Sequence, residues 1–200
     1  MPHSSPNLSD YLDPCDVIDC LHPAVAAQAR SLAQGSDDRE SVARACFEFV
    51  RDRISHSGDV RADAVTCRAS DVLEQGTGWC FAKSHLLAAL LRANGIAAGL
   101  CYQRLAKDDH PGDFTLHGLN AVWLDGHDWY RCDPRGDKPG VSTAFSPPEE
   151  RLAWPMRVPG EMLFSAVLPR PLPLIVDYLQ GVHGWQAVLD SLPDTEKLSW

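Results

Sequence analysis

The sequence lacks several features that mark broad functional classes. It has no excess of positive charge, because 27 acidic residues face 18 lysines and arginines, for a net charge of −9. We therefore expect no nucleic acid as a partner. No apolar run reaches the roughly 18 residues that a membrane span needs, so we expect no membrane partner either. The first residues also have neither the basic region nor the apolar core of a secretory signal.

Cysteines are present but form no recognisable framework. Their number, 7, is odd and their spacing does not repeat, so free thiols in a cytoplasmic, reducing location are the simplest interpretation. Cys15, Cys20 and His22 lie close together, but no second Cys/His pair follows at the spacing of a zinc site. We predict no metal site and no cofactor. The sequence leaves the oligomeric state open.

The stretch from Gly76 to Ala97 organises the rest of the chain. Its middle, from Phe81 to Ala93, is rich in Ala and Leu, which favour a helix, and Asn94-Gly95 is a natural helix stop. The run is apolar on most sides. We therefore expect a helix that is buried in the middle of a domain.

Cys80 falls on the first turn of this expected helix. Unpaired N–H groups and the helix dipole favour an anion there, so the thiol is expected to lose its proton readily and to act as a nucleophile. The alternative is that Cys80 is a small buried hydrophobic side chain, as most free cysteines are.

The surrounding pattern predicts an α+β fold. Helices are expected at 23–33 and up to about residue 53, and strands at 96–105, 116–124 and 128–133 form an antiparallel sheet on which the central helix packs. A short helix is expected at 149–154. We assign residues 1–200 to a single domain with a core of about 36–136 and a Pro-rich C-terminal extension.

His117 and Asp133 lie on the second and third of these strands. His117 follows Cys80 by 37 residues, and Asp133 follows His117 by 16. A thiolate nucleophile needs a base, and the base needs an acceptor that fixes its tautomer and orientation. Together the three side chains would supply all three roles. His85, one turn into the central helix, is an alternative base.

The turn between the last two strands tests this assignment. Residues opposite each other in an antiparallel pair share a face of the sheet. A two-residue Gly126-His127 loop would place Asp133 opposite Asn120 and turn it away from His117. We therefore predict an odd loop, such as Asp125-Gly126-His127, or a bulge.

Several short motifs in this region resemble one family. They are Gly78-Trp79-Cys80, the Leu-Leu-Arg-Ala-Asn-Gly-Ile-Ala run at 90–97, His117 before Asn120-Ala-Val-Trp, and Trp129-Tyr-Arg-Cys-Asp-Pro. In their order and spacing they resemble the transglutaminase-like (papain-like thiol) superfamily, over roughly residues 41–134.

The resemblance implies a papain-like/transglutaminase-like core and a role for each of three residues. Cys80 would be the nucleophile, His117 the general base and acid, and Asp133 the residue that orients His117. It also implies amide bonds as substrates, so a peptide or protein is the expected partner.

The chain departs from the family pattern at three places. Phe81 fits only loosely at the position after the cysteine, where the family often has an aromatic or charged residue. Gly118 stands where the family has an aromatic residue directly after its histidine. No tryptophan precedes Trp79, whereas eukaryotic transglutaminases use an upstream tryptophan to hold the oxyanion.

The Cys80 backbone N–H can be one oxyanion donor. Gln75 is a candidate for the second, or else an exposed polar residue at a helix end. Trp79 and Asn120 are candidates for lining the cleft.

We expect a cysteine-dependent hydrolase of amide or peptide bonds, or an acyl transferase, that works through a thioester on Cys80. Hydrolysis is favoured over cross-linking, because 200 residues leave no room for the calcium-dependent flanking domains of eukaryotic transglutaminases. Two alternatives remain. One is a non-catalytic peptide-binding module with a transglutaminase-like fold, and the other is an acyltransferase that uses an acyl-thioester donor.

Overall fold

The structure, a computed structural model, describes residues 7–107 and 112–199. The start of the N-terminal tail and His110, which we expect in a solvated loop, lie outside these described residues. Helices come first along the chain and strands follow. The helices are η1 (Leu8–Tyr11), α1 (Pro23–Leu32), α2 (Arg39–Arg53), α3 (Ser57–Val60), α4 (Ala69–Gln75), α5 (Cys80–Ala93), α6 (Pro173–Gly181) and α7 (Trp185–Asp190).

The strands form one main sheet and two small ones. They are β1 (Ser55–His56), β2 (Thr77–Gly78), β3 (Ala98–Ala106), β4 (Phe114–Leu124), β5 (Asp128–Cys132), β6 (Ala144–Ser146), β7 (Glu149–Arg151) and β8 (Met162–Leu163). The main sheet has the order β5-β4-β3-β8, and every pair in it is antiparallel. β1 and β2 form a parallel pair, and β6 and β7 an antiparallel one.

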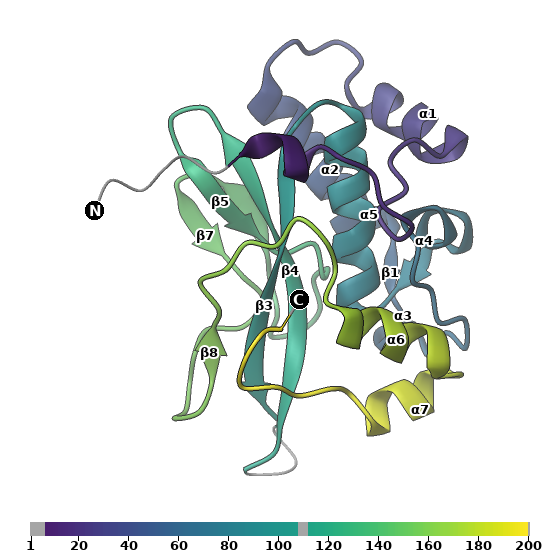
Figure 1. The fold of residues 1–200 in the computed structure, drawn as a ribbon, viewed down its shortest axis with the longest axis vertical. Coiled ribbons are helices and arrows are strands. Elements are labelled where there is room, and N and C mark those ends of the chain that lie inside the picture. The colour runs from purple at the N-terminus through teal and green to yellow at the C-terminus, as the bar shows by residue number, and fades with distance from the viewer. Residues whose placement is uncertain (1–6, 108–111, 200) are drawn as a thin grey trace.

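Helix α5 is the centre of the fold. It lies between the main sheet and the helices α1, α2 and α4 (Figure 1). Every residue from Cys80 to Arg92 is buried, including the charged Lys83 and Arg92. This confirms the buried central helix on an antiparallel sheet, and with it the α+β fold class. It also explains the apolar run, because a helix covered on all sides has no face for solvent.

The predicted helix at 149–154 is wrong. Glu149–Arg151 is strand β7, which pairs with β6, and the chain from Leu152 to Trp154 is irregular. An isolated helix of six residues is unstable without an apolar face to bury, whereas an extended segment here finds backbone partners on β6.

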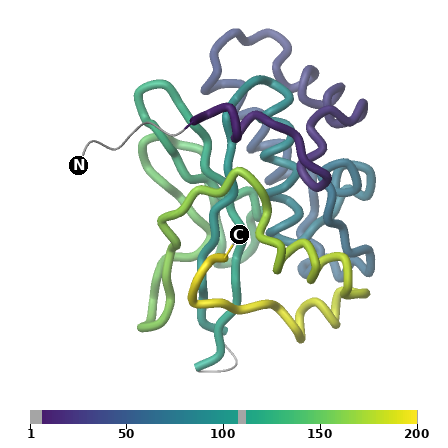
Figure 2. The backbone as a smooth tube through the Cα atoms, viewed as in Figure 1, coloured from purple at the N-terminus to yellow at the C-terminus, as the bar shows by residue number. Residues whose placement is uncertain are grey.

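The C-terminal extension folds back over the sheet. Figure 2 shows its last segment passing close to the two long central strands. The backbone N–H of Leu116 on β4 donates to the Pro193 carbonyl at 2.7 Å. Arg104 on β3 holds the Asp194 carboxylate through two hydrogen bonds of 2.7 Å. The extension is therefore part of the packing around β3 and β4. No helix in the described parts of the chain has the length and apolarity to cross a membrane.

Candidate active site

Cys80 is the first residue of α5, with Trp79 as its N-cap, and the residue is 7% exposed. The first N–H groups of a helix have no partner within the helix, so the sulfur lies next to free backbone donors. The next residue, Phe81, packs directly on Gly118 of β4. Because Gly118 has no side chain, the first turn of α5 comes close to β4. This brings Cys80 next to His117, the residue before Gly118.

The imidazole of His117 is hydrogen-bonded to Asp133 through Nε2 and Oδ2, at 2.8 Å. Both side chains are buried, with 4% and 0% exposure. In the ladder of β4 and β5, Leu124 pairs with Asp128, so the turn has the three residues 125–127. The predicted odd loop is confirmed. It gives Asp133 the same face as His117, because a shift by one residue would reverse the faces.

The carboxylate of Asp133 receives two further hydrogen bonds from backbone N–H groups. Ala153 donates to Oδ2 at 3.0 Å, and Arg135 donates to Oδ1 at 3.1 Å. Trp154 then lies edge-on to the His117 ring, with centroids 4.7 Å apart. The segment around Ala153 therefore covers the His117–Asp133 pair, although only a short helix of the C-terminal extension was expected there.

The His117–Asp133 pair carries opposite charges. Burial by itself lowers the pKa of His117, but the charges of Asp133 and Cys80 and hydrogen bonds to both raise it to about 10. Burial raises the pKa of Asp133, but the His117 ring and the two backbone donors bring it below its ordinary value. Near neutral pH the pair is thus an imidazolium and a carboxylate, and His117 holds a proton that it can transfer.

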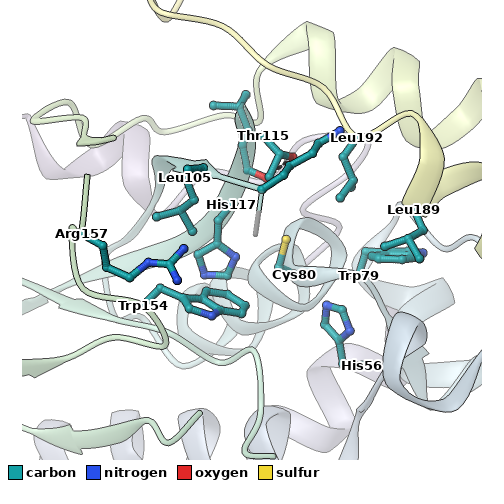
Figure 3. A pocket seen from close by; sticks show the side chains of 13 residues that line it. His56, Trp79, Cys80, Leu105, Thr115, His117, Trp154, Arg157, Leu189 and Leu192 are labelled. Carbon is teal, nitrogen blue, oxygen red and sulfur yellow. Dashed lines mark hydrogen bonds between the residues drawn. The ribbon is translucent and has the colours of Figure 1, made fainter. Parts of the chain in front are cut away.

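Cys80 and His117 line a common cavity of about 290 Å³ (Figure 3). Its walls are largely apolar and come from distant parts of the chain. The residues lining it include His56, Trp79, Leu105, Leu116, Trp154, Leu189 and Leu192. None of the lining residues within the described chain is acidic, and Lys107 and Arg157 contribute positive charge. Arg157 also pairs with Glu161 at 3.5 Å.

Of the other three predicted site residues, Trp79 lines the cavity, and Gln75 and Asn120 do not. Gln75 is exposed at the end of α4 and lies outside the cavity lining, so the exposed polar alternative holds. Asn120 is fully buried and donates to the carbonyls of Ser84 and Gly99 at 2.9 and 3.3 Å. Its side chain is on the face of β4 opposite to that of His117. Its hydrogen bond to Ser84 joins α5 to the sheet.

The remaining candidates have structural partners. His85 is buried, and its Nδ1 lies 2.8 Å from the Cys67 carbonyl, so it is turned away from the role of base. In the described chain no three His, Cys, Asp or Glu side chains are placed to hold a metal ion. All seven cysteines are free thiols.

His56 and Trp154 are the two aromatic residues of the cavity that sequence reasoning missed. His56 precedes Cys80 by 24 residues and follows the end of α2, and no local pattern marks it. Trp154 is in the Pro-rich segment, where a helix was expected. The only signal for Trp154 in the sequence is that it is an aromatic residue outside the motif region.

The sequence profile of the transglutaminase-like superfamily matches residues 26–134, which is more than half of the chain. The chain belongs to the transglutaminase-like superfamily. The match ends just after Asp133, so Trp154, Leu189 and Leu192 come from outside it. No curated protein shows significant sequence similarity to the chain.

Solved structures that are similar to part of this chain include the following two. One is a protein from Cytophaga hutchinsonii described as a candidate cysteine protease, with a TM-score of 0.52 and 20% identity over 68% of this chain and 45% of that one. The other is the periplasmic domain of TgpA from Pseudomonas aeruginosa, with a TM-score of 0.47 and 19% identity over 62% and 45%. At these identities the first similarity describes the fold alone. The chain spans less than half the length of either protein.

Proposed function

We propose that this protein is a cysteine-dependent hydrolase of amide or peptide bonds, or an acyl transferase, that works through a thioester on Cys80. One observation carries the proposal. Cys80 and His117 line one cavity, and the same imidazole is held by Asp133 through Nε2 at 2.8 Å. This leaves the other ring nitrogen for the sulfur. A nucleophile, a base and an orienting acceptor are thus available in one place.

The mechanism follows from these positions. The Cys80 sulfur attacks the carbonyl carbon, and the carbonyl electrons move to oxygen, near the N-terminus of α5. His117 gives its proton to the leaving amine as the C–N bond breaks, and a thioester remains on Cys80. Water then attacks the thioester, His117 accepts its proton, and the C–S bond breaks. With an amine in place of water, the same steps give transfer.

The cavity supports an acyl group with an apolar portion. Leu105, Leu116, Leu189 and Leu192 provide apolar surface close to Cys80. The description of the Cytophaga hutchinsonii protein as a candidate cysteine protease agrees with a peptide substrate. We favour hydrolysis over transfer. The cytoplasmic location stays a prediction from the sequence, as does the lack of nucleic-acid and membrane partners.

A non-catalytic peptide-binding module remains the alternative function. Such a module would need the cavity but not a buried ion pair. Burying the charges of His117 and Asp133 costs free energy that must be recovered through their mutual contacts, and perturbed groups of this kind concentrate at functional sites. The buried pair therefore favours the catalytic proposal.

Acyl-enzyme trapping tests the proposal. The protein is incubated with p-nitrophenyl acetate, and intact mass and peptide mapping follow the adduct. We expect one acetyl group on Cys80, released by hydroxylamine and missing in Cys80→Ala. Absence in the wild type both of the adduct and of p-nitrophenol release that depends on Cys80 would contradict the proposal. A glutamine-bearing peptide with a fluorescent primary amine then distinguishes the two outcomes for the thioester, because efficient amine incorporation would make transfer the main reaction.

A further inference from the structure

His56 lines the cavity and carries a ring nitrogen for which no described residue supplies a hydrogen-bond partner. Its ring extends into the cavity on the side of Cys80 (Figure 3). Nδ1 is buried and has no hydrogen-bond partner among the described residues. The nearest carboxylate oxygen, Oδ1 of Asp59, is 3.9 Å away, which is too far for a hydrogen bond. A buried polar group without a partner is costly, so a polar group of a ligand in the cavity is a natural partner for the His56 ring.

The His56 ring is neutral at physiological pH. Burial lowers the pKa of His56 well below its ordinary value, and the positive charge of Arg135 lowers it further. The opposing charge of Asp59 is already paired, since Arg135 holds both of its carboxylate oxygens at 2.5 and 2.7 Å. A neutral imidazole has one N–H donor and one acceptor. His56 can therefore donate a hydrogen bond while keeping its proton.

The backbone fixes His56 beside the residues that lead to Cys80. Strand β1 pairs with β2 so that His56 is opposite Gly78, two residues before Cys80. The ring also lies edge-on to Trp79, with centroids 5.3 Å apart. Gly58 leaves the space for this pair, because a Cβ there would be 3.0 Å from the Trp79 ring and 3.3 Å from Cε1 of His56. The donor is thus held in place before a substrate arrives.

We propose that His56 is a catalytic residue that donates a hydrogen bond to the substrate carbonyl oxygen as it becomes an oxyanion. The inference rests on the proposed thioester chemistry. As the C–S bond forms, the carbonyl electron pair moves to oxygen, where the His56 N–H and the Cys80 backbone N–H stabilise the charge. His56 thereby takes the role of second oxyanion donor, for which Gln75 was the candidate. Trp79 is the competing donor, since its indole Nε1 is also buried without a partner in the described chain.

Two reactions of Cys80 separate this role from others. Acylation by p-nitrophenyl acetate passes through an oxyanion, whereas alkylation by iodoacetamide does not. Both need the same nucleophile. We therefore compare the two rates in wild type, His56→Phe and His56→Gln, with Cys80→Ala to subtract labelling of other thiols. His127→Gln, in an exposed turn, is the matched control for loss of a histidine.

We expect His56→Phe to slow acylation about 100-fold and to change alkylation less than about threefold. His56→Gln retains an N–H donor and should recover part of the loss. Equal losses in both reactions, or no loss in acylation, would overturn the inference. So would a selective loss of acylation in Trp79→Phe with none in the His56 variants. If wild type is acylated no faster than Cys80→Ala, the proposed function itself fails, and the role of His56 fails with it.

Discussion

Gly118 of β4 and Phe81 of α5 touch so closely that no side chain fits between them. A Cβ on Gly118 would lie 2.8 Å from Cδ1 and 3.1 Å from Cα of Phe81. This contact gives a physical reason for the missing aromatic residue after His117. The space that a side chain would occupy is filled by the first turn of the helix that carries Cys80.

Gly118→Ala should therefore destabilise the fold and displace Cys80. We expect a loss of about 1–3 kcal/mol in the free energy of unfolding, because the clash is partly with backbone atoms that cannot rotate away. Cys80 alkylation should slow as well. Chemical denaturation and iodoacetamide kinetics measure the two effects. Gly181→Ala, where a Cβ meets nothing within 4 Å, is the control and should show neither.

Asp133→Asn should lower the pKa of His117. The carboxylate charge is a main cause of the raised pKa of about 10, and Asn removes the charge but keeps the shape. We expect a decrease of about 1–3 pH units, measured by NMR titration of the imidazole nitrogens. Cys80→Ala should also lower the pKa of His117, since the sulfur is a second cause. A His117 pKa that is the same in all three proteins would show that the ring is not coupled to either partner.

The buried Lys83 should make stability depend on pH in a predictable direction. It is fully buried, donates to the carbonyls of Ile54 and Arg51, and burial together with Arg135 lowers its pKa from 10.5 to about 7. Between these values the unfolded chain binds more protons at this site, so the contribution of Lys83 to stability rises with pH.

Lys83→Met should remove this pH dependence. The free energy of unfolding of wild type minus that of Lys83→Met should increase from about pH 7 to about pH 10, measured by chemical denaturation. Lys197→Met, at an exposed position, serves as the control and should give a difference that stays constant. A difference that decreases with pH would contradict the assignment of a lowered pKa.

The sequence predicted those parts of the site that follow local rules. The Ala/Leu run and Asn94-Gly95 mark α5, which places Cys80 on a first turn. Side chains alternate between the two faces along β4 and β5, so an odd number of residues in the turn puts His117 and Asp133 on the same face. These signals depend on neighbours along the chain or on one hairpin, so they can be read without coordinates.

The parts that were missed depend on contacts that no local pattern encodes. The N–H of Ala153 reaches Asp133 from an irregular segment in which a short helix was expected. His56 enters the cavity because β1 pairs in parallel with β2, although the 20 residues 57–76 separate the two strands.

Gln75 and Asn120 were candidates because they are close in sequence to Cys80 and His117. In the structure Gln75 is exposed at the end of α4, and Asn120 is on the face of β4 opposite to that of His117. Tertiary packing decides such positions.

The central claim is that the reactivity of Cys80 depends on His117. The most direct measurement is the second-order rate of Cys80 alkylation by iodoacetamide near neutral pH, followed by peptide mapping in wild type, His117→Ala and the control His127→Ala. We expect a fast reaction in wild type and in the control, and a rate at least about tenfold lower in His117→Ala. A wild-type Cys80 no more reactive than a thiol in the denatured chain, or an equal rate in His117→Ala, would contradict the claim.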